Sequence, residues 1–389
     1  MKVPSKSLSL TRKLISFNTI NPPGQERKCA EYLGGLLQDE GFKITFHDFD
    51  EGRTSLIARI EGSGDKPPIC FTGHMDTIPL GAASWNMDPF IGEVDGDRVF
   101  GRGSSDMKAG LAAMVIASIR LAKISKRVAG LTLVITAGEE TGSEGADHLA
   151  KLGNVLGKPG AILVGEPTSN YPLVGHKGPL WLQATATGVT AHGSMPHKGV
   201  NAIYKAARAV TKLQEYDFDN APHPVLGAPT LNVGTISGGL NINSVPDLTT
   251  IGIDIRTIPG ITHSSLLEDL QSHLGEEVKL KSLLALDSVA TDPQDGWVQE
   301  IIDIMEPFLS KRPEPRGATY FTDAAIFTPA LGNPPTIILG PGEPTMAHKT
   351  DEFCYISKIE DATEAYFEIA KRWCSSPQRP LYHLPELPR

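Results

Sequence analysis

Apolar segments of strand length alternate with longer segments of helical pattern over about the first 175 residues, and this alternation limits the possible folds more than any other feature. Residues 67–71, 131–140 and 161–167 contain apolar runs, and residues 107–125 and 143–152 have the helical pattern between them. Strands that are apolar throughout are buried on both faces, as in parallel sheets covered by helices. We therefore expect an α/β domain with a mixed, mostly parallel sheet and helices on both faces.

The pattern changes near residue 178 and returns to its first form near residue 290. Between these points, half-exposed strands and helices are predicted for residues 179–189, 199–216, 249–258 and 264–275. A length of 389 residues also exceeds what one hydrophobic core usually fills, about 250 to 300 residues. The expected organisation is a large domain of residues 1–177 and 291–389, interrupted by an inserted α+β domain of residues 178–290.

Charge and cysteine usage narrow the partners and the compartment. The net charge is −9, from 36 Lys and Arg against 45 Asp and Glu, which argues against nucleic acid or an anionic membrane as the main partner. The apolar run at 109–119 is too short to span a bilayer, and the N-terminus lacks the features of a signal peptide. The four scattered cysteines form no disulfide framework. We expect a cytoplasmic protein that binds neither nucleic acid nor membrane.

A histidine and an aspartate stand where the first central strand should end. His74 and Asp76 come shortly after the apolar run, and at a spacing of two along an extended chain they point the same way. Ligands of open α/β sheets usually bind at this carboxyl edge. Two interpretations remain open here. The pair is either a metal ligand with the carboxylate that orients it, or a strand end followed by a turn-forming aspartate.

Further polar clusters lie at or after the ends of other predicted strands. They contain Asp106, Glu139, Glu140, Glu166 and His348. Because neighbouring parallel strands end at one edge, these side chains and His74 should converge on one crevice. Several carboxylates in a dry crevice repel each other unless cations neutralise them. Two imidazoles and three carboxylates suit Zn²⁺ or a similar divalent ion, and a shared carboxylate would allow two ions ~3.5 to 4 Å apart.

Each cluster also has an ordinary structural interpretation. Asp106 opens a predicted helix after a Gly-rich loop and could be its N-cap, while Glu139 and Glu140 could form a solvated turn. That loop lacks the spacing of a phosphate-binding P-loop. The chain also lacks the G-x-S-x-G motif of serine hydrolases and the H-E-x-x-H motif of many zinc proteases.

Six motifs, in order and over nearly the whole chain, resemble the M20 metallohydrolases, in particular the acetylornithine deacetylase and succinyl-diaminopimelate desuccinylase branch. They read GHMDTIP, GRGSSDMKAG, TAGEETGSEGA, GEPTS, TAHGSMPHKGVNAI and AHKTDEF. The segments TINPPG, PTLNVGTISGG, DIRTIPG and ILGPG are similar to the acetylornithine deacetylases. The resemblance implies that the large domain is catalytic and that the inserted domain is a lid through which two copies form a homodimer.

The resemblance also implies how the polar residues divide between two metal ions, Zn²⁺ with Co²⁺ or Mn²⁺ as substitutes. His74 would bind one ion with Glu166, and His348 would bind the other with Glu140. Asp106 would bridge the two ions. Asp76 is similar to the carboxylate that fixes the tautomer and angle of the first histidine.

Four residues receive roles in the reaction by the same resemblance. Glu139 would be the general base that takes a proton from a water bridging the metals and gives it to the leaving amine. His192 would stabilise the oxyanion in the active site of the partner subunit, although alone it reads as a turn residue. Arg256 and Asn243 would hold the substrate carboxylate. An outward-facing arginine on an edge strand is the alternative for Arg256.

Two departures from the family bear on the substrate. His176 and Lys177 occupy the segment where succinyl-diaminopimelate desuccinylases usually have a second basic residue, an arginine. Thr322 and Asp323 occupy the place where acetylornithine deacetylases tend to have a glutamate. We expect metal-dependent hydrolysis of the amide bond of an N-acyl amino acid or short peptide. A dipeptidase or carboxypeptidase of the same fold, or a relative that binds without turnover, are the alternatives.

Overall fold

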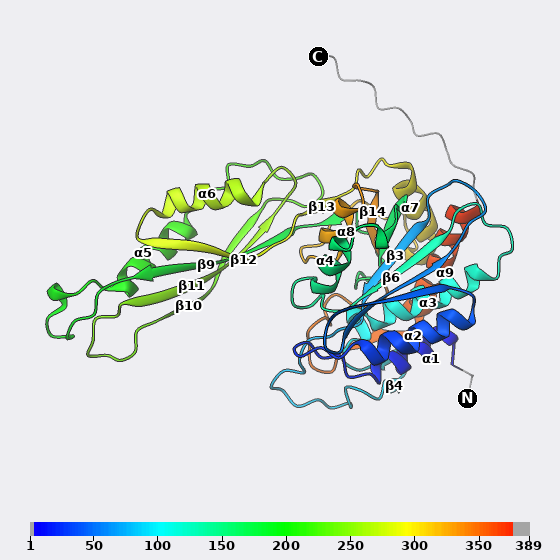
Figure 1. Ribbon diagram of the computed structural model, residues 1–389, viewed down its shortest axis with the longest axis horizontal. Coiled ribbons are helices and arrows are strands. Elements are labelled where there is room, and N and C mark those ends of the chain that lie inside the picture. Colours follow the sequence, from blue (N-terminus) through cyan, green and yellow to red (C-terminus); the bar gives the residue numbers. More distant parts are fainter. Residues whose placement is uncertain (1–3, 376–389) are drawn as a thin grey trace, which may run out of the picture. The chain divides into compact units, whose positions relative to one another are not determined.

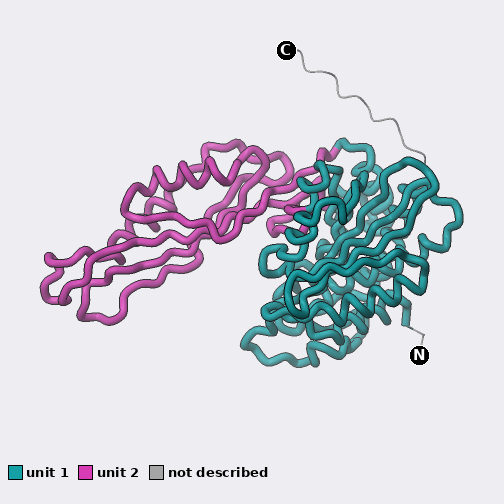
Figure 2. Tube along the Cα trace, viewed as in Figure 1, with its two compact units in different colours: residues 1–172, 294–313, 327–389 teal, residues 173–293, 314–326 magenta. Residues whose placement is uncertain are grey.

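The computed structural model describes residues 4–375, which form two compact units (Figure 2). Unit 1 contains residues 1–172, 294–313 and 327–389, and unit 2 contains residues 173–293 and 314–326. The insertion expected at 178–290 therefore corresponds to a slightly longer segment, and unit 2 also takes up a second, short piece of chain. None of the helices formed by residues 4–375 combines the length and the apolar character needed to cross a membrane.

Unit 1 is built on a six-stranded sheet (Figure 1). Its strands, in spatial order, are β1 (Lys43–Asp50), β2 (Arg53–Ile60), β6 (Leu131–Thr136), β3 (Ile69–His74), β7 (Ala161–Val164) and β14 (Thr336–Ile338). The last four strands are mutually parallel, whereas β1 and β2 are antiparallel to their neighbours. Every residue of β3, β6 and β7 is buried, as expected for parallel strands covered on both faces.

Helices cover both faces of this sheet. Helix α2 (Arg27–Asp39) approaches the side chains of Ile44 and Phe46 at Gly34, and α4 (Glu144–Lys151) approaches Ser55 at Gly145. Phe46 pairs with Leu56 across the sheet, so Ser55 points to the opposite face. Helices α1 (Lys6–Ile15), α3 (Ala109–Ala122) and α9 (Ile356–Ser375) pack together, and α9 reaches β3 through the ring contact of Tyr366 with Phe71. The mixed, mostly parallel fold class is confirmed.

The remaining elements complete the two units. They are β4 (Val94–Asp95), β5 (Arg98–Phe100) and β15 (Phe353–Tyr355), which form a small sheet; β8 (Gly175–His176) and β13 (Val289–Ala290), which pair; η1 (Ser104–Lys108), η2 (Asn154–Leu156) and η3 (Pro196–Lys198); and α7 (Gly296–Leu309) and α8 (Ala324–Ala330). The irregular turn η1 leads into α3 and carries Asp106.

Unit 2 is an antiparallel sheet with two helices over one face. Its strands, in spatial order, are β10 (Thr230–Gly238), β11 (Leu248–Thr257), β9 (Gly178–Thr187) and β12 (Val278–Ala285), and its helices are α5 (Ala202–Gln214) and α6 (His263–Leu274). Burial alternates residue by residue along β9 and β11. The inward residues, such as Leu182 and Ile253, join Ala206 of α5 and Leu270 of α6 in one core. This is the expected α+β architecture.

The short piece at 314–326 belongs to unit 2 because its backbone lies beside β8. The N–H of Ala318 donates to Gly175 over 2.8 Å, and the N–H of Val174 donates to Arg316, also over 2.8 Å. These are long-range pairings that the sequence pattern of either segment does not reveal, since both are short and neither alternates. The expected boundary at residue 290 therefore omits this return of the chain.

Candidate metal centre

Parallel strands of unit 1 deliver the polar clusters to one edge. His74 is the last residue of β3, Glu139 and Glu140 follow the end of β6, and Glu166 follows the end of β7. Because β6, β3 and β7 are neighbours and parallel, their carboxyl ends meet. Asp106 enters from η1 and His348 from the loop after β14. All of these residues belong to unit 1.

Asp106 lies between the two histidines. Its Oδ1 is 3.2 Å from Nε2 of His74, and its Oδ2 is 3.5 Å from Nε2 of His348. The same nitrogen of each imidazole also faces a second carboxylate. Nε2 of His74 is 3.6 Å from Oε1 of Glu166, and Nε2 of His348 is 3.0 Å from Oε2 of Glu140. The five side chains thus form two groups, each with one imidazole and one glutamate, that share one aspartate.

Glu139 lies in the same cluster as a buried side chain. Ligand atoms of His74, Glu139 and Glu166 all lie within 4.8 Å of one another, and the same holds for His74, Asp106 and Glu140. The adjacent residues Glu139 and Glu140 therefore both face the crevice but join different groups.

Asp76 holds the backbone of this edge in place. Its carboxylate accepts the N–H groups of Glu139 and Glu140, each over 3.1 Å. Nδ1 of His74 lies 2.9 Å from the main-chain oxygen of Asp76 and 3.5 Å from its Oδ1. The nearest acceptor for the ring is thus the carbonyl oxygen of Asp76, while its carboxylate also fixes the turn after β6.

The acid–base properties of the cluster fit a cation site. Burial raises the pKa of Glu140 to about 7 and that of Glu166 to about 8, and neighbouring carboxylates add to both shifts. Hydrogen bonds to Asp106 and Glu140 raise the pKa of His348 to about 10. The buried carboxylates are thus balanced by protons on their neighbours. A divalent ion satisfies the same charges with its preferred ligands, so the donor set present here fits one or two such ions.

The other three predicted residues lie in unit 2. His192 and Asn243 are exposed and lie in adjacent loops, since the N–H of Gly193 donates to the carbonyl of Asn243 over 2.7 Å. Arg256 lies on β11, where its Nε is 3.0 Å from Oδ1 of Asp254. Its Nη1 is buried without a hydrogen-bond partner. Arg256 is thus a partly buried, ion-paired residue whose Nη1 stays without a partner.

Strand β11 separates Arg256 from the other two. The loop of Asn243 precedes Leu248, the first residue of β11, and Arg256 is the penultimate residue of that strand. The eight steps between Leu248 and Arg256 span about 26 Å at ~3.3 Å per residue. Unit 2 therefore brings His192 and Asn243 together but holds Arg256 at its opposite end.

Sequence reasoning did not single out Asn21, which supports Asp76. Its Nδ2 donates to Oδ2 of Asp76 over 2.9 Å and to the hydroxyl of Thr141 over 2.8 Å. It thereby joins the loop after α1 to the turns that follow β3 and β6. Asn21 lies in the segment TINPPG, which resembles the acetylornithine deacetylases, but an asparagine before two prolines also suits an ordinary turn.

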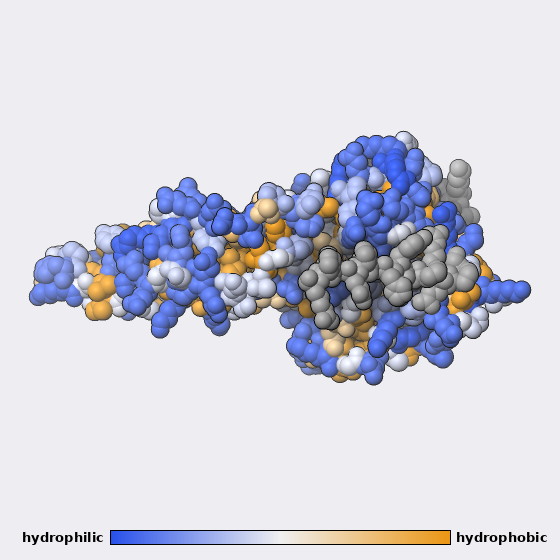
Figure 3. Space-filling model, turned by 90° about the horizontal axis from the view of Figure 1, so that it is seen from above, coloured by the Kyte–Doolittle hydropathy of each residue, from blue (hydrophilic) through white to orange (hydrophobic). Residues whose placement is uncertain are grey.

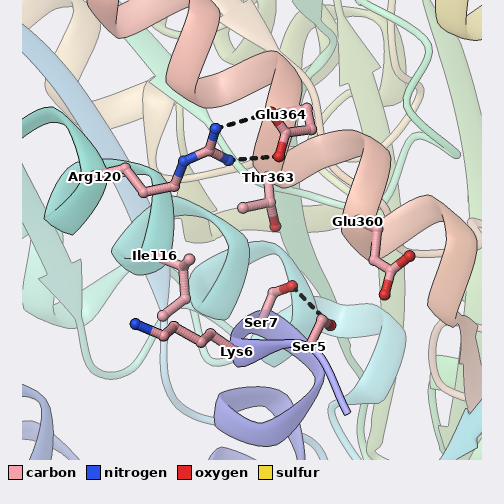
Figure 4. A pocket seen from close by; sticks show the side chains of 8 residues that line it. All are labelled: Ser5, Lys6, Ser7, Ile116, Arg120, Glu360, Thr363 and Glu364. Atoms are coloured by element: carbon pink, nitrogen blue, oxygen red, sulfur yellow. Dashed lines mark hydrogen bonds and ion pairs between the residues drawn. The ribbon is translucent and has the colours of Figure 1, made fainter. Parts of the chain in front are cut away.

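A separate pocket of about 400 Å³ lies among α1, α3 and α9 (Figure 4). It is lined by Ser5, Lys6, Ser7, Ile116, Arg120, Glu360, Thr363 and Glu364, and contains none of the cluster residues. The guanidinium of Arg120 donates to both carboxylate oxygens of Glu364, over 2.6 and 2.9 Å. Its charge is thus already paired, and the polar cluster remains the better functional candidate.

The α/β fold and the shared-aspartate cluster are the arrangement expected of a metallohydrolase. It belongs to peptidase family M20/M25/M40, whose model matches residues 70–372. The chain is 32% identical to a probable succinyl-diaminopimelate desuccinylase from Staphylococcus epidermidis, over 93% of this chain and 98% of that one. It is also 32% identical to an acetylornithine deacetylase from Proteus mirabilis, over 96% and 98% of the two chains.

Solved structures share the fold at lower identity. An M20 metallo-carboxypeptidase from Sulfolobus solfataricus matches with a TM-score of 0.83 at 19% identity, over 95% of this chain and 99% of that one. A dinuclear metal-binding M20 peptidase from Bacillus subtilis matches with a TM-score of 0.70 at 16% identity, over 94% and 96% of the two chains. The chain is therefore a member of a metal-dependent hydrolase family that includes dinuclear proteins.

Proposed function

We propose that the protein hydrolyses the amide bond of an N-acyl amino acid at a pair of divalent ions, Zn²⁺ or its substitutes. The observation that carries this proposal is the position of Asp106 between His74 and His348, each of which faces its own glutamate. One carboxylate shared by two such groups is the arrangement expected for two ions ~3.5 to 4 Å apart. The names of the curated relatives, a desuccinylase and a deacetylase, favour an acyl amino acid as the substrate class.

The residues of the cluster divide the chemical work. When bound, the ions would lower the pKa of water and polarise the amide carbonyl. Glu139, beside His74 and Glu166, would take a proton from the attacking water and deliver it to the leaving nitrogen. Asp76 would keep this base in place through the N–H of Glu139. Arg256, with its unpartnered Nη1, would bind the substrate carboxylate.

A substrate panel tests the reaction class. The protein loaded with Zn²⁺, and in parallel with Co²⁺, is offered N-acetyl and N-succinyl amino acids and dipeptides, and release of the free amine is measured. We expect turnover of at least one N-acyl amino acid, and turnover slower by ~10² or more in the Glu139→Ala variant. Turnover of dipeptides alone would assign the protein to the peptidases of the family. Metal binding without turnover of any compound would overturn the proposed enzymatic function.

We also propose that two copies form a homodimer through unit 2. The about 26 Å between the two ends of β11 is too long for His192 and Arg256 of one subunit to surround the same small substrate. If Arg256 serves the site of its own subunit, then His192 and Asn243 must serve another. A symmetric dimer supplies that second site, because each copy offers the same loops to its partner.

Exposed apolar side chains support an interface near these loops. Leu240 and Ile242 are fully exposed, and Ile236 and Leu248 are about half exposed. On the face drawn in Figure 3, apolar side chains of unit 2 reach the surface among hydrophilic ones. Among the described residues β10 pairs with β11 alone, so its other edge is available to a second chain. An edge strand flanked by exposed apolar residues is typical of a protein–protein interface.

The oligomeric state tests this interface directly. We expect a dimer in sedimentation equilibrium for the unmodified protein and a shift toward monomer for the variant Leu240→Asp/Ile242→Asp. A matched control, Leu283→Asp, changes an exposed leucine on β12 at the far edge of the same sheet and should leave the dimer intact. A monomeric unmodified protein would contradict the proposal.

The cytoplasmic location remains a proposal as well. All four cysteines, Cys29, Cys70, Cys354 and Cys374, are free and buried. Free thiols are the usual state in a reducing compartment.

A further inference from the structure

An ion pair that is not part of the ligand set is buried beneath the cluster. The side chains of Arg102 and Glu352 are 2% and 0% exposed, and Nη1 of the arginine lies 2.7 Å from Oε2 of the glutamate. Burying two charges costs free energy that their attraction alone often does not recover. A pair in this position therefore calls for an explanation in terms of the geometry that it imposes.

The carboxylate of Glu352 accepts four hydrogen bonds, two at each oxygen. Oε2 accepts from Arg102 and from the N–H of Gly103 over 2.9 Å. Oε1 accepts from the N–H of Ser105 over 2.7 Å and from the N–H of Asp106 over 3.0 Å. Three of the four donors are backbone groups of the turn that ends in the shared aspartate, so this carboxylate fixes the position of Asp106 from below.

Arg102 extends the same contact to two other loops. Its Nη1 donates to the carbonyl of Lys349, the residue after His348, over 3.2 Å. Its Nη2 donates to the carbonyl of Pro79, in the loop that follows His74 and Asp76, over 3.2 Å. The guanidinium also lies 5.0 Å from the ring centre of Trp85 in that loop. One planar side chain therefore touches the loops of three cluster members.

We propose that Arg102 and Glu352 are positioning residues that fix the distances among the loops of His74, Asp106 and His348. This inference rests on the proposed metal centre, because its effect is on how tightly and in what geometry that centre binds ions. Only a planar group with several donors can reach Pro79, Lys349 and Glu352 together, and only a carboxylate can accept two donors at each of its oxygens. Neither residue touches the substrate in this account.

The first test replaces Glu352 by glutamine. Glu352→Gln keeps the shape of the side chain but replaces one carboxylate oxygen by an NH₂ group. The two donors that face this group then lose their acceptor. Residues that orient metal ligands typically contribute 10- to 100-fold to metal affinity. We expect the affinity for Zn²⁺ to fall at least ~10-fold in competition with a chromophoric chelator. The absorption spectrum of the Co²⁺-loaded protein should also change, since ligand geometry changes.

A second variant and a matched control separate positioning from general destabilisation. Arg102→Lys keeps the positive charge but cannot reach three acceptors, so it should show the same change in the Co²⁺ spectrum. It serves as the test if Glu352→Gln does not fold. Leu37→Ala removes a fully buried side chain of α2 that belongs to none of these loops. It should lower thermal stability yet leave Zn²⁺ affinity and the Co²⁺ spectrum unchanged.

The positioning role and the metal centre can be tested separately. In metal-free protein, backbone hydrogen exchange at residues 103–106 should be faster in Glu352→Gln than in Leu37→Ala, which tests the positioning without any ion. A folded Glu352→Gln or Arg102→Lys protein with unchanged exchange, affinity and spectrum would overturn the inference. An unmodified protein that binds no divalent ion would overturn the metal centre instead, whatever the exchange at residues 103–106.

Discussion

Two buried histidines, one in each unit, illustrate how differently the units use their interiors. His74 of unit 1 and His176 of unit 2 are both almost completely excluded from solvent. Burial opposes protonation of His74, but Glu166, Asp106 and Asp76 outweigh it and raise its pKa well above the ordinary value. Burial lowers the pKa of His176 to about 4. The neighbours, and not the burial, decide whether a buried imidazole carries charge.

The same contrast holds for the units as a whole. Unit 1 gathers at least five ionisable side chains at the carboxyl edge of its sheet and holds them with buried polar groups such as Asp76 and Glu352. Unit 2 has an apolar core beneath α5 and α6, and leaves apolar residues such as Leu240 on its surface. A concentration of buried charge suits ion binding, and an exposed apolar edge suits a protein partner.

The largest expected effect comes from removing the ions that unit 1 is proposed to hold. Chelation should abolish activity, because it removes the ions that the five proposed ligands would hold. Protons can then balance the charge of the carboxylates, but they cannot activate water as the ions would. Activity measured before chelation, after it, and after addition of Zn²⁺, Co²⁺ or Mn²⁺ provides the check. Full activity in protein shown to be metal-free by elemental analysis would contradict the proposal that unit 1 holds catalytic ions.

Next in size is the difference between two adjacent glutamates of unit 1. Glu139→Ala should retain metal and fold but lose kcat by ~10² or more, because it removes proton transfer. Glu140→Ala should instead lower metal content, since Glu140 faces His348 over 3.0 Å. Metal content and kcat are measured on both variants. Metal loss in the Glu139 variant alone would exchange the two roles.

Much of unit 1 could be predicted because its signals are local. A run such as 131–136 is mostly apolar, and a charged residue after each such run indicates the edge of the sheet. Helix α9, by contrast, was not predicted, although buried Ile359, Tyr366 and Ile369 recur at helical spacing within it. Strands β10 and β12 were also missed, because both are largely exposed and a register shift interrupts the alternation of apolar and polar residues in each.

The contacts that hold the site could not be predicted in the same way. Arg102 and Glu352 are 250 residues apart, and both lie in motifs that were already noted for other residues. Nothing in either motif states that a charged side chain is buried, or which partner satisfies it. Long-range pairing of this kind depends on the assembled sheet, as does the pairing of residue 318 with β8.

A smaller effect should follow from changes in unit 2 that act on the site of unit 1. If His192 stabilises the oxyanion, His192→Ala should cost about 3 kcal/mol, or ~10²-fold, mainly in kcat. Metal content should stay unchanged, since His192 belongs to unit 2 and all five proposed ligands belong to unit 1. Steady-state kinetics and elemental analysis measure the two properties. A variant that loses metal would show that the separation between the units is wrong.

Mixed dimers test whether His192 acts in the active site of the partner subunit. Co-expression of His192→Ala with Glu139→Ala subunits should regenerate activity, because one site of the hybrid then has an intact base and an intact partner imidazole. The two parent variants, prepared alone, are the controls. Hybrid dimers that form but stay as inactive as their parents would exclude service in trans, and a fully active monomer would exclude a catalytic role for the dimer.

The smallest expected effect is on the stability of the fold and comes from the protonation of His176. Its pKa falls from the ordinary 6.5 to about 4 because the ring is buried, with its Nδ1 near the carbonyl of Lys177 and its Nε2 unpartnered. The unfolded chain therefore binds more protons than the folded one between these values. The stability due to the neutral ring is complete above pH 6.5 and is lost as the pH falls toward 4. By pH 5 the loss should reach about 2 kcal/mol.

The variant His176→Gln removes this titration and isolates it from acid effects on unit 1. Urea unfolding of both proteins at pH 7 and pH 5 gives the difference in their free energies of unfolding at each pH. This difference should shift by about 2 kcal/mol in favour of the variant at pH 5, whereas other titrating groups cancel because both proteins contain them. His197→Gln, at an exposed position of the same unit, is the control. An unchanged difference would mean that the ring gains a proton without unfolding, so that unit 2, like unit 1, accommodates a buried charge.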